Sequence, residues 1–275
     1  MKAKKVAFWI FVYTFSLLII IFAVVPFLWT VVSSLKLEGD IYTTNFFPTN
    51  PTLKNYIGVL TDNIMMGYFL NSVVISLAST AVSTIVSLLG AYGFSRYQFP
   101  GKGTLLYSIL FTRVLPRVTL LIPFFVILSK INLINTRSSL ILVYLIIGMP
   151  VSVWLMKGYI DAVPYEVEEA ALMDGCGPIR TLVRVVIPMV APAIAAISMF
   201  AFILSWNEFL FPRVLTTMPE VRPISVGLAF YIDDVKVQWG MLMAASVIMS
   251  IPAILVFSFA QKYIVRGLSE GAVKG

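Results

Sequence analysis

The chain has 275 residues, of which 59% are hydrophobic and 12% are charged, and its mean hydropathy is +0.94. Soluble domains carry about 25% charged residues, so a globular core cannot take up this much apolar surface, whereas a lipid bilayer can. The chain has no His and one Cys, which excludes the usual metal clusters and disulfide frameworks. The net charge of +7 is scattered without a long basic run, and this excludes a nucleic-acid-binding patch.

Six apolar stretches are long enough to cross a bilayer, which takes roughly 20 residues each. We therefore predict an all-α, polytopic membrane protein with about six transmembrane helices, in which residues 1–275 form a single transmembrane domain. The first stretch is too long for the apolar core of a signal peptide, and we expect it to be retained. The second is rich in Ser and Ala, which allow helices to pack closely. The predicted spans are residues 6–32, 69–94, 104–128, 138–156, 188–211 and 240–261.

Positive charge indicates how these spans are oriented. Six spans place both termini on the same side of the membrane. Lys2, Lys4 and Lys5 stand at the N-terminus, and more of the remaining Lys and Arg residues fall on that side than on the other. Because basic residues favour the cytoplasmic side, we predict cytoplasmic termini in the cell membrane and a cytoplasmic loop over 157–187.

This loop has the pattern of two short helices joined by a bend. Pro164 suits the first turn of a helix, and the acids that follow complement the helix dipole. The pattern predicts a helix over 165–173 that ends at Gly175, because Gly readily adopts the left-handed conformation of a helix C-terminus. Pro178 can begin the next helix, whose apolar residues recur at helical spacing.

The same loop resembles a known motif. Glu169-Ala170-Ala171 is followed by Gly175 and then, after nine intervening residues, by Val185-Val186-Ile187-Pro188. This resembles the "EAA" loop of permease subunits of ATP-binding cassette (ABC) importers. Val185 and Ile187 stand where that family often has Ile and Leu, and Leu172 stands where Ala is frequent.

Three further segments extend the resemblance along nearly the whole chain. Residues 47–56, 205–209 and 267–275 are similar to the external segment, the fifth span and the C-terminal tail of carbohydrate permeases of the MalG type. The resemblance implies a permease subunit of an ATP-driven importer for sugars such as maltose, trehalose or related oligosaccharides. It also implies a transporter subunit that catalyses no covalent reaction.

The resemblance implies roles and partners for particular residues. The loop would dock on a cytoplasmic ATPase, with Glu169 paired to a basic residue there and Gly175 setting the bend. The implied partners are a second, MalF-like permease, two copies of an ATPase subunit, an extracellular sugar-binding protein and membrane lipid. The ATPase-coupling residues are Glu169, Ala170, Ala171, Asp174, Gly175 and Pro188, and the ATPase-contacting tail residues are Gly267, Glu270, Gly271, Lys274 and Gly275.

Nucleotide chemistry belongs to other chains in this interpretation. A phosphate-binding loop requires Gly-x-x-x-x-Gly-Lys-Ser/Thr. The nearest fragment, residues 100–104, lacks the first Gly at the required spacing and reads as a turn between two spans. We therefore expect no cofactor on this chain and place ATP and Mg on the partner ATPase subunits.

Charged residues inside the predicted spans are candidates for the translocation pathway. Arg113 and Arg117 are four residues apart in the third span, so a continuous helix places them on one face. Each charge at membrane depth costs about 2.5 kcal/mol or more, so such residues normally face a cavity or a partner. Glu208, with its neighbours Trp206 and Asn207, is the matching acidic candidate in the fifth span. An internal ion pair is the alternative interpretation.

Other functions fit less well. Arg113 and Arg117 keep open a permease of the same architecture that imports glycerol phosphate or another polyol. A secondary transporter normally has two internally related halves, which this sequence lacks. An intramembrane enzyme needs a nucleophile–base set or a metal motif, and a chain without His offers neither.

Overall fold

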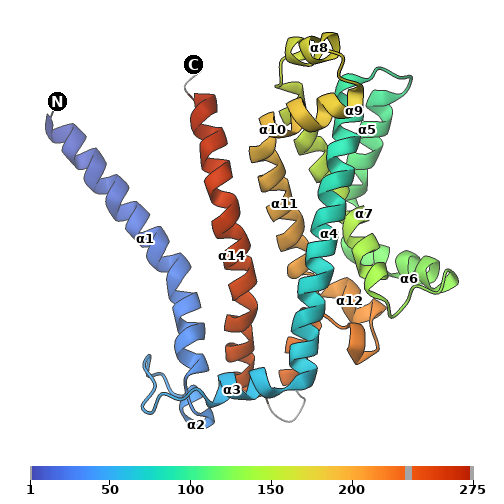
Figure 1. The fold of residues 1–275 in the computed structure, drawn as a ribbon. Helices are drawn as coiled ribbons and strands as arrows, with labels where there is room; N and C mark the ends of the chain where they lie inside the picture. Colours follow the sequence, from blue (N-terminus) through green and yellow to red (C-terminus); the bar gives the residue numbers. More distant parts are fainter. Residues whose placement is uncertain (1, 233–236, 273–275) are drawn as a thin grey trace. The chain divides into compact units, whose positions relative to one another are not determined.

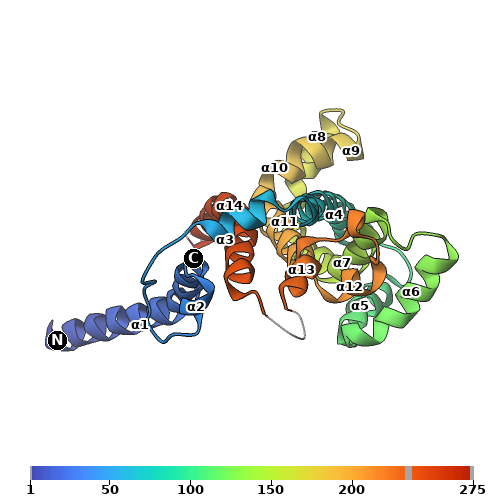
Figure 2. The same cartoon turned by 90° about the horizontal axis from the view of Figure 1, so that it is seen from below.

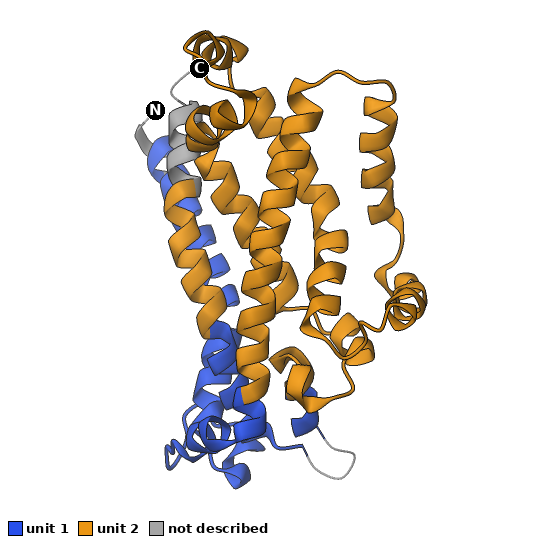
Figure 3. Cartoon of the chain, turned by 45° about the vertical axis from the view of Figure 1, so that its right-hand side comes forward, with its two compact units in different colours: residues 1–66, 228–250 blue, residues 67–227, 251–275 orange. Residues whose placement is uncertain are grey.

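The computed structural model describes residues 2–232 and 237–272, with side chains described for 4–6, 8–232 and 237–263. Within these ranges the fold is all-α, and its one extended feature is an isolated bridge between Ile232 and Val237. The all-α, polytopic class predicted from the composition is confirmed. The chain divides into two compact units, residues 1–66 with 228–250 and residues 67–227 with 251–275 (Figure 3).

Four helices are each long and apolar enough to cross a membrane (Figure 1). The most hydrophobic 18-residue stretch of α1 is wholly exposed, whereas 56% of the corresponding stretch of α7 is buried. Side chains that are both apolar and exposed need a nonaqueous surrounding, and lipid supplies it. The four helices are α1 (Lys2–Ser34), α4 (Asn63–Arg96), α7 (Arg137–Asp161) and α14 (Trp239–Ala272).

The third predicted span, over 104–128, is a bent pair of helical segments. Helix α5 (Lys102–Phe111) and η1 (Thr112–Val114) are followed by η2 (Arg117–Leu120) and α6 (Leu121–Lys130), with a bend of 103° between the two halves. The reason is Pro116, which has no N–H and forces the preceding residue out of the helical region. Leu115 accordingly adopts φ −69° and ψ 129°.

The fifth predicted span is also interrupted. The segment Pro178–Met189 meets helix α11 (Ala191–Trp206) at 83°, so the described residues contain up to six spans if each bent pair counts as one. Helix α11 ends at Trp206, short of the expected 211, and a separate helix α12 (Leu210–Leu215) follows. Helix α12 packs against α7 and α6, beside α13 (Ile224–Gly227) in the view from below (Figure 2).

In the first unit, hydrogen bonds fix the chain after α1. The Asn55 amide, on α3 (Lys54–Thr61), donates to the carbonyls of Ser34 and Lys36 at 2.8 and 3.0 Å. Lys36 is 1% exposed and donates to the Asn45 carbonyl at 2.5 Å. A Cβ on Gly240 would lie 2.7 Å from the Asn55 amide, so only glycine allows α14 to start this close to α3. The short helix α2 (Glu38–Ile41) lies within this segment.

In the second unit, α4 packs with α7 and α11 around an apolar core. Small residues on α4 allow the close approach that the Ser- and Ala-rich composition predicts, because small side chains let helix backbones come near each other. Thr84 of α4 hydrogen-bonds Ser198 of α11 at 2.9 Å. The buried serines of α4 recur at helical spacing and are Ser72, Ser76, Ser79, Ser83 and Ser87.

Candidate functional site

Helix α8 (Tyr165–Met173) stands beyond the ends of α4 and α7 (Figure 1) and carries Glu166, Glu168 and Glu169. It covers the residues predicted to be helical. Gly175 has φ +84°, and its N–H donates to the Leu172 carbonyl at 3.0 Å, while the Cys176 N–H donates to the Ala171 carbonyl at 3.0 Å. This pair of bonds is a Schellman motif, which ends a helix at a left-handed glycine.

The chain after the bend begins a second short helix. Pro178 occupies the first turn of α9 (Pro178–Thr181), where its missing N–H costs nothing. The wider turn η3 (Leu182–Val186) and α10 (Ile187–Met189) lead into α11, with Leu182 and Val186 buried in the core. The predicted bend at Gly175 and the predicted start at Pro178 are confirmed. Pro188 lies in α10 and is exposed.

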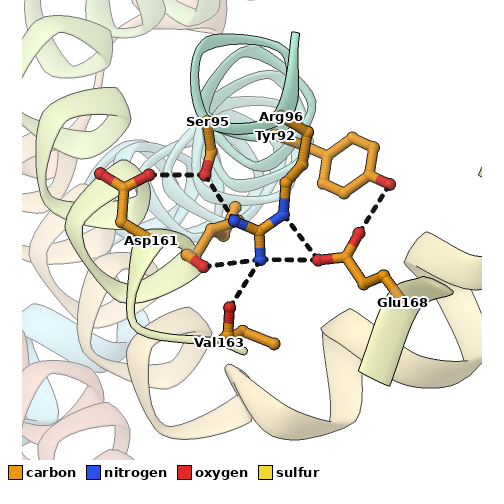
Figure 4. Close-up of polar contacts among 7 residues, drawn as sticks. Tyr92, Ser95, Arg96, Asp161, Val163 and Glu168 are labelled. Atoms are coloured by element: carbon orange, nitrogen blue, oxygen red, sulfur yellow. Dashed lines mark hydrogen bonds and ion pairs between the residues drawn. The ribbon is translucent and has the colours of Figure 1, made fainter. Parts of the chain in front are cut away.

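One residue of α8 is buried, and it is an acid. Glu168 is 2% exposed, whereas Glu169 and Ala170 are exposed and Ala171 is half-buried. The Glu168 carboxylate accepts from Arg96 Nε at 2.6 Å, and Arg96 Nη2 lies 2.6 Å from the same oxygen. The Tyr92 hydroxyl donates to the second carboxylate oxygen at 3.0 Å (Figure 4). Glu168 is therefore held by two residues of α4.

The Arg96 guanidinium also reaches the end of α7. Its Nη2 donates to the carbonyls of Ile160 and Val163 at 2.9 and 3.0 Å, and its Nη1 donates to Ser95 Oγ at 3.1 Å (Figure 4). Ser95 Oγ in turn donates to Asp161 at 2.5 Å. One planar fork thus joins α4, the end of α7 and α8. In the sequence, Arg96 is recognisable only as a basic residue at a membrane edge, and no local signal distinguishes Glu168 from its acidic neighbours.

Opposite this buried contact, α8 and α9 present apolar side chains to the exterior. Met173 is 88% exposed and Ile179 is 79% exposed. Tyr165 and Leu172 are partly exposed but share the helix face of Glu168, and the Tyr165 ring lies 5.8 Å from the Arg96 guanidinium. Such side chains are shielded by lipid on a membrane span, but here they sit on a short loop that also carries exposed Glu166 and Glu169. A mixed apolar and acidic surface of this kind is typical of a protein contact.

The charged candidates of the third and fifth spans lie on either side of the helix break. Arg113 is in η1 and Arg117 begins η2, so the break separates them instead of stacking them on one helix face. Both still line a pocket of about 170 Å³, together with Ile147, Met149 and Pro150. The Nε of Arg113 is buried with no partner among the described residues.

The structure pairs Arg117 with the predicted acid. Arg117 Nη1 lies 3.3 Å from Glu208 Oε2, and the other oxygen of Glu208 accepts the Leu210 N–H at 3.0 Å. Trp206 is 2% exposed and packs against the rings of Phe69 and Phe202, so it belongs to the core. The Asn207 amide donates to the Ile203 carbonyl of its own helix.

The predicted tail contacts fall at the edge of the described chain. Gly267, Glu270 and Gly271 lie in the last turns of α14, in a stretch whose side chains are outside the described residues. Lys274 and Gly275 lie outside the described residues altogether. The ATPase-contacting role of the tail stays a prediction.

Comparison with known proteins identifies the class. Residues 83–270 match the family described as binding-protein-dependent transport system inner membrane component, and the chain belongs to this family. It is a multi-pass membrane protein and a transport permease subunit rather than an enzyme.

Two relatives and one solved structure are similar to this chain over most of its length. The chain is 33% identical over 263 residues to the trehalose/maltose transport system permease MalG of Thermococcus litoralis, covering 94% of this chain and 95% of the relative. It is 32% identical to a sulfoquinovosyl glycerol transport system permease of Agrobacterium fabrum, covering 91% and 88%. A chain of a bacterial ABC transporter that imports the acidic polysaccharide alginate superposes with a TM-score of 0.81 at 25% identity, covering 94% and 97%.

The left-handed glycine of the bend gives a testable prediction. Changing Gly175→Val places a β-branched residue at φ +84° and should cost about 1–2 kcal/mol. The backbone amides at 175 and 176 should then exchange hydrogen roughly 5–30 times faster. Gly177→Val is the matched control, because Gly177 has φ −77° and open space around its Cα. Equal exchange in the two variants would contradict the assignment of the bend.

Proposed function

We propose that this chain is one of two permeases in an ATP-driven importer of neutral sugars. It would pair with a MalF-like permease and receive cargo from an extracellular sugar-binding protein. Two ATPase subunits would provide the driving force and hold ATP and Mg. The relatives named for trehalose/maltose and for diacetylchitobiose transport support a sugar as cargo. The solved alginate transporter in complex with its periplasmic protein supports the general arrangement through its shared fold.

The observation that carries this proposal is the two-sided character of α8. Its inner side is anchored by buried Glu168, and its outer side leaves Glu166, Ala170 and Met173 exposed, with Glu169 exposed at the flank. A short helix that is anchored on one side and unpartnered on the other is suited to dock in a cleft of a soluble subunit. The basic N-terminus supports placing this helix, and both chain ends, in the cytoplasm.

Docking alone does not drive transport. A motor subunit shifts the permease between two states only if it binds α8 with different energy in each state. We place this differential contact on the exposed coupling residues, with Glu169 as the charged contact to a basic residue of the ATPase. Ala170 and Ala171 leave room for close approach, and the bend at Gly175 fixes the angle between α8 and α9.

A charge reversal tests the docking role of Glu169. In vesicles containing the complete importer, Glu169→Lys should reduce sugar uptake at least tenfold, because it places like charges against each other. Glu169→Gln, which keeps the shape of the side chain, should have a smaller effect. Membrane insertion should match the unmodified chain, since Glu169 is exposed and makes no contact that supports the fold. Unimpaired uptake by Glu169→Lys would refute this role.

A second candidate cargo is anionic, such as glycerol phosphate or an acidic sugar. The observation that favours it is Arg113, whose Nε is buried without a partner in the described part of the chain and which lines a pocket with Arg117. Glu208 pairs with Arg117, so the described pocket region keeps a net positive charge. The relatives named for sulfoquinovosyl glycerol and for alginate transport agree with this alternative.

Uptake measurements separate the two cargo classes. Vesicles with the complete importer and its binding protein are supplied in turn with labelled maltose, trehalose and glycerol 3-phosphate. The neutral-sugar proposal predicts ATP-dependent uptake of a disaccharide and none of the phosphate. Uptake of glycerol 3-phosphate alone would reverse this assignment and would identify the positive pocket as part of the anion pathway.

A further inference from the structure

The attachment of α8 to the membrane helices sets how a push on α8 is transmitted. Helix α8 continues through α9 and η3 toward α11, which is one route. The second route leaves α8 through the side chain of Glu168 and reaches α4 and α7 directly. Because Glu168 is the buried residue of α8, this second route does not depend on apolar packing by the helix itself.

The electrostatics make this contact stiff. The side chains of Arg96 and Glu168 are 11% and 2% exposed, so water does little to screen their attraction. Removing either partner would leave the other as a buried and unpaired charge, which is strongly unfavourable. Tyr92 occupies the second carboxylate oxygen, so Glu168 is bound at both oxygens.

The shape of the guanidinium group explains why position 96 is an arginine. Its planar fork donates to Glu168, to the Ile160 and Val163 carbonyls and to Ser95 at once. A lysine ammonium is a point charge with three donors on one atom, and it cannot span acceptors on three separate elements. Lysine at this position would keep the charge and lose most of the geometry.

We infer that Arg96 is a positioning residue for coupling: through Glu168 it locks α8 to α4 and to the end of α7, so that displacement of α8 moves these helices together. This rests on the proposed docking of α8 on an ATPase. Glu168 and Glu169 then have separate tasks although they are neighbours. Glu168 ties α8 to its own subunit, and Glu169 faces the partner.

The experiment uses the complete importer with its ATPase subunits and compares Arg96→Lys, Arg96→Gln and Glu168→Gln. Two quantities are measured: hydrogen exchange of the α8 amides, and sugar molecules taken up per ATP hydrolysed. Glu220→Gln is the matched control, because it removes an exposed carboxylate of the same unit that lies outside α8 and its docking surface. In each sample, co-purification of the ATPase subunits is measured to confirm assembly.

We expect α8 exchange to rise at least tenfold in the three variants and to stay unchanged in the control. Uptake per ATP should fall at least tenfold while the ATPase subunits still co-purify, and Arg96→Lys should be impaired nearly as much as Arg96→Gln. A double variant, Arg96→Gln with Glu168→Gln, should be no worse than either single variant, because the two residues act as a unit.

Two results would overturn the inference. The first is α8 exchange in the variants that equals that of the unmodified importer, which would mean that the pair does not hold the helix. The second is faster exchange with unchanged uptake per ATP, which would mean that the pair holds the helix but transmits nothing. Failure of the proposed function itself is distinguishable, because the unmodified importer would then neither retain ATPase subunits nor take up sugar.

Discussion

The buried ion pair between Arg96 and Glu168 is the constraint on which the position of α8 and the bend after it depend. Helix α8 has nine residues, too few to be stable in water by itself, and it does not bury an apolar face against the membrane helices. What holds it is a carboxylate taken out of water, which must be paired because an uncompensated buried charge costs about 3–5 kcal/mol. The Schellman bend at Gly175 then directs the chain into α9 and back to the core. The position of the exposed surface of α8 follows from these two features.

This arrangement suits a subunit that is moved from outside. The chain carries no phosphate-binding motif, and its family is the membrane component of binding-protein-dependent transport. Apolar contacts between helices can slide or repack, whereas a fork that donates to three elements has one satisfactory geometry. The breaks at Pro116 and after Met189 place bends in two spans, and the first of these brings Arg113 and Arg117 to the same pocket. The molecule thus combines an ion-paired attachment of α8 with a broken third span that lines a charged pocket.

Much of the fold follows from local rules that a sequence displays. Apolar length predicts the long helices, and Pro164, Gly175 and Pro178 predict the ends of α8 and α9, because each of these residues restricts its own backbone. Pro116 also signals the break in 104–128, but a proline does not by itself give the angle of the bend. The role of Glu168 could not be predicted from the sequence, because Glu166, Glu168 and Glu169 are indistinguishable acids there. Their difference arises from Arg96, which lies 72 positions away along the chain. Hydrophobic periodicity identifies buried apolar residues, but it gives no indication that an acidic residue is buried.

The most direct test of the central claim is a pair of structures of the complete importer, determined by electron cryomicroscopy in the resting state and with ATP bound. We expect α8, the end of α4 that carries Arg96 and the end of α7 to move as one body. The Arg96 guanidinium and the Glu168 carboxylate should stay within ion-pair distance, about 4 Å, in both states. Separation of this pair in the ATP-bound state, with α8 moving while α4 and α7 remain in place, would contradict this claim.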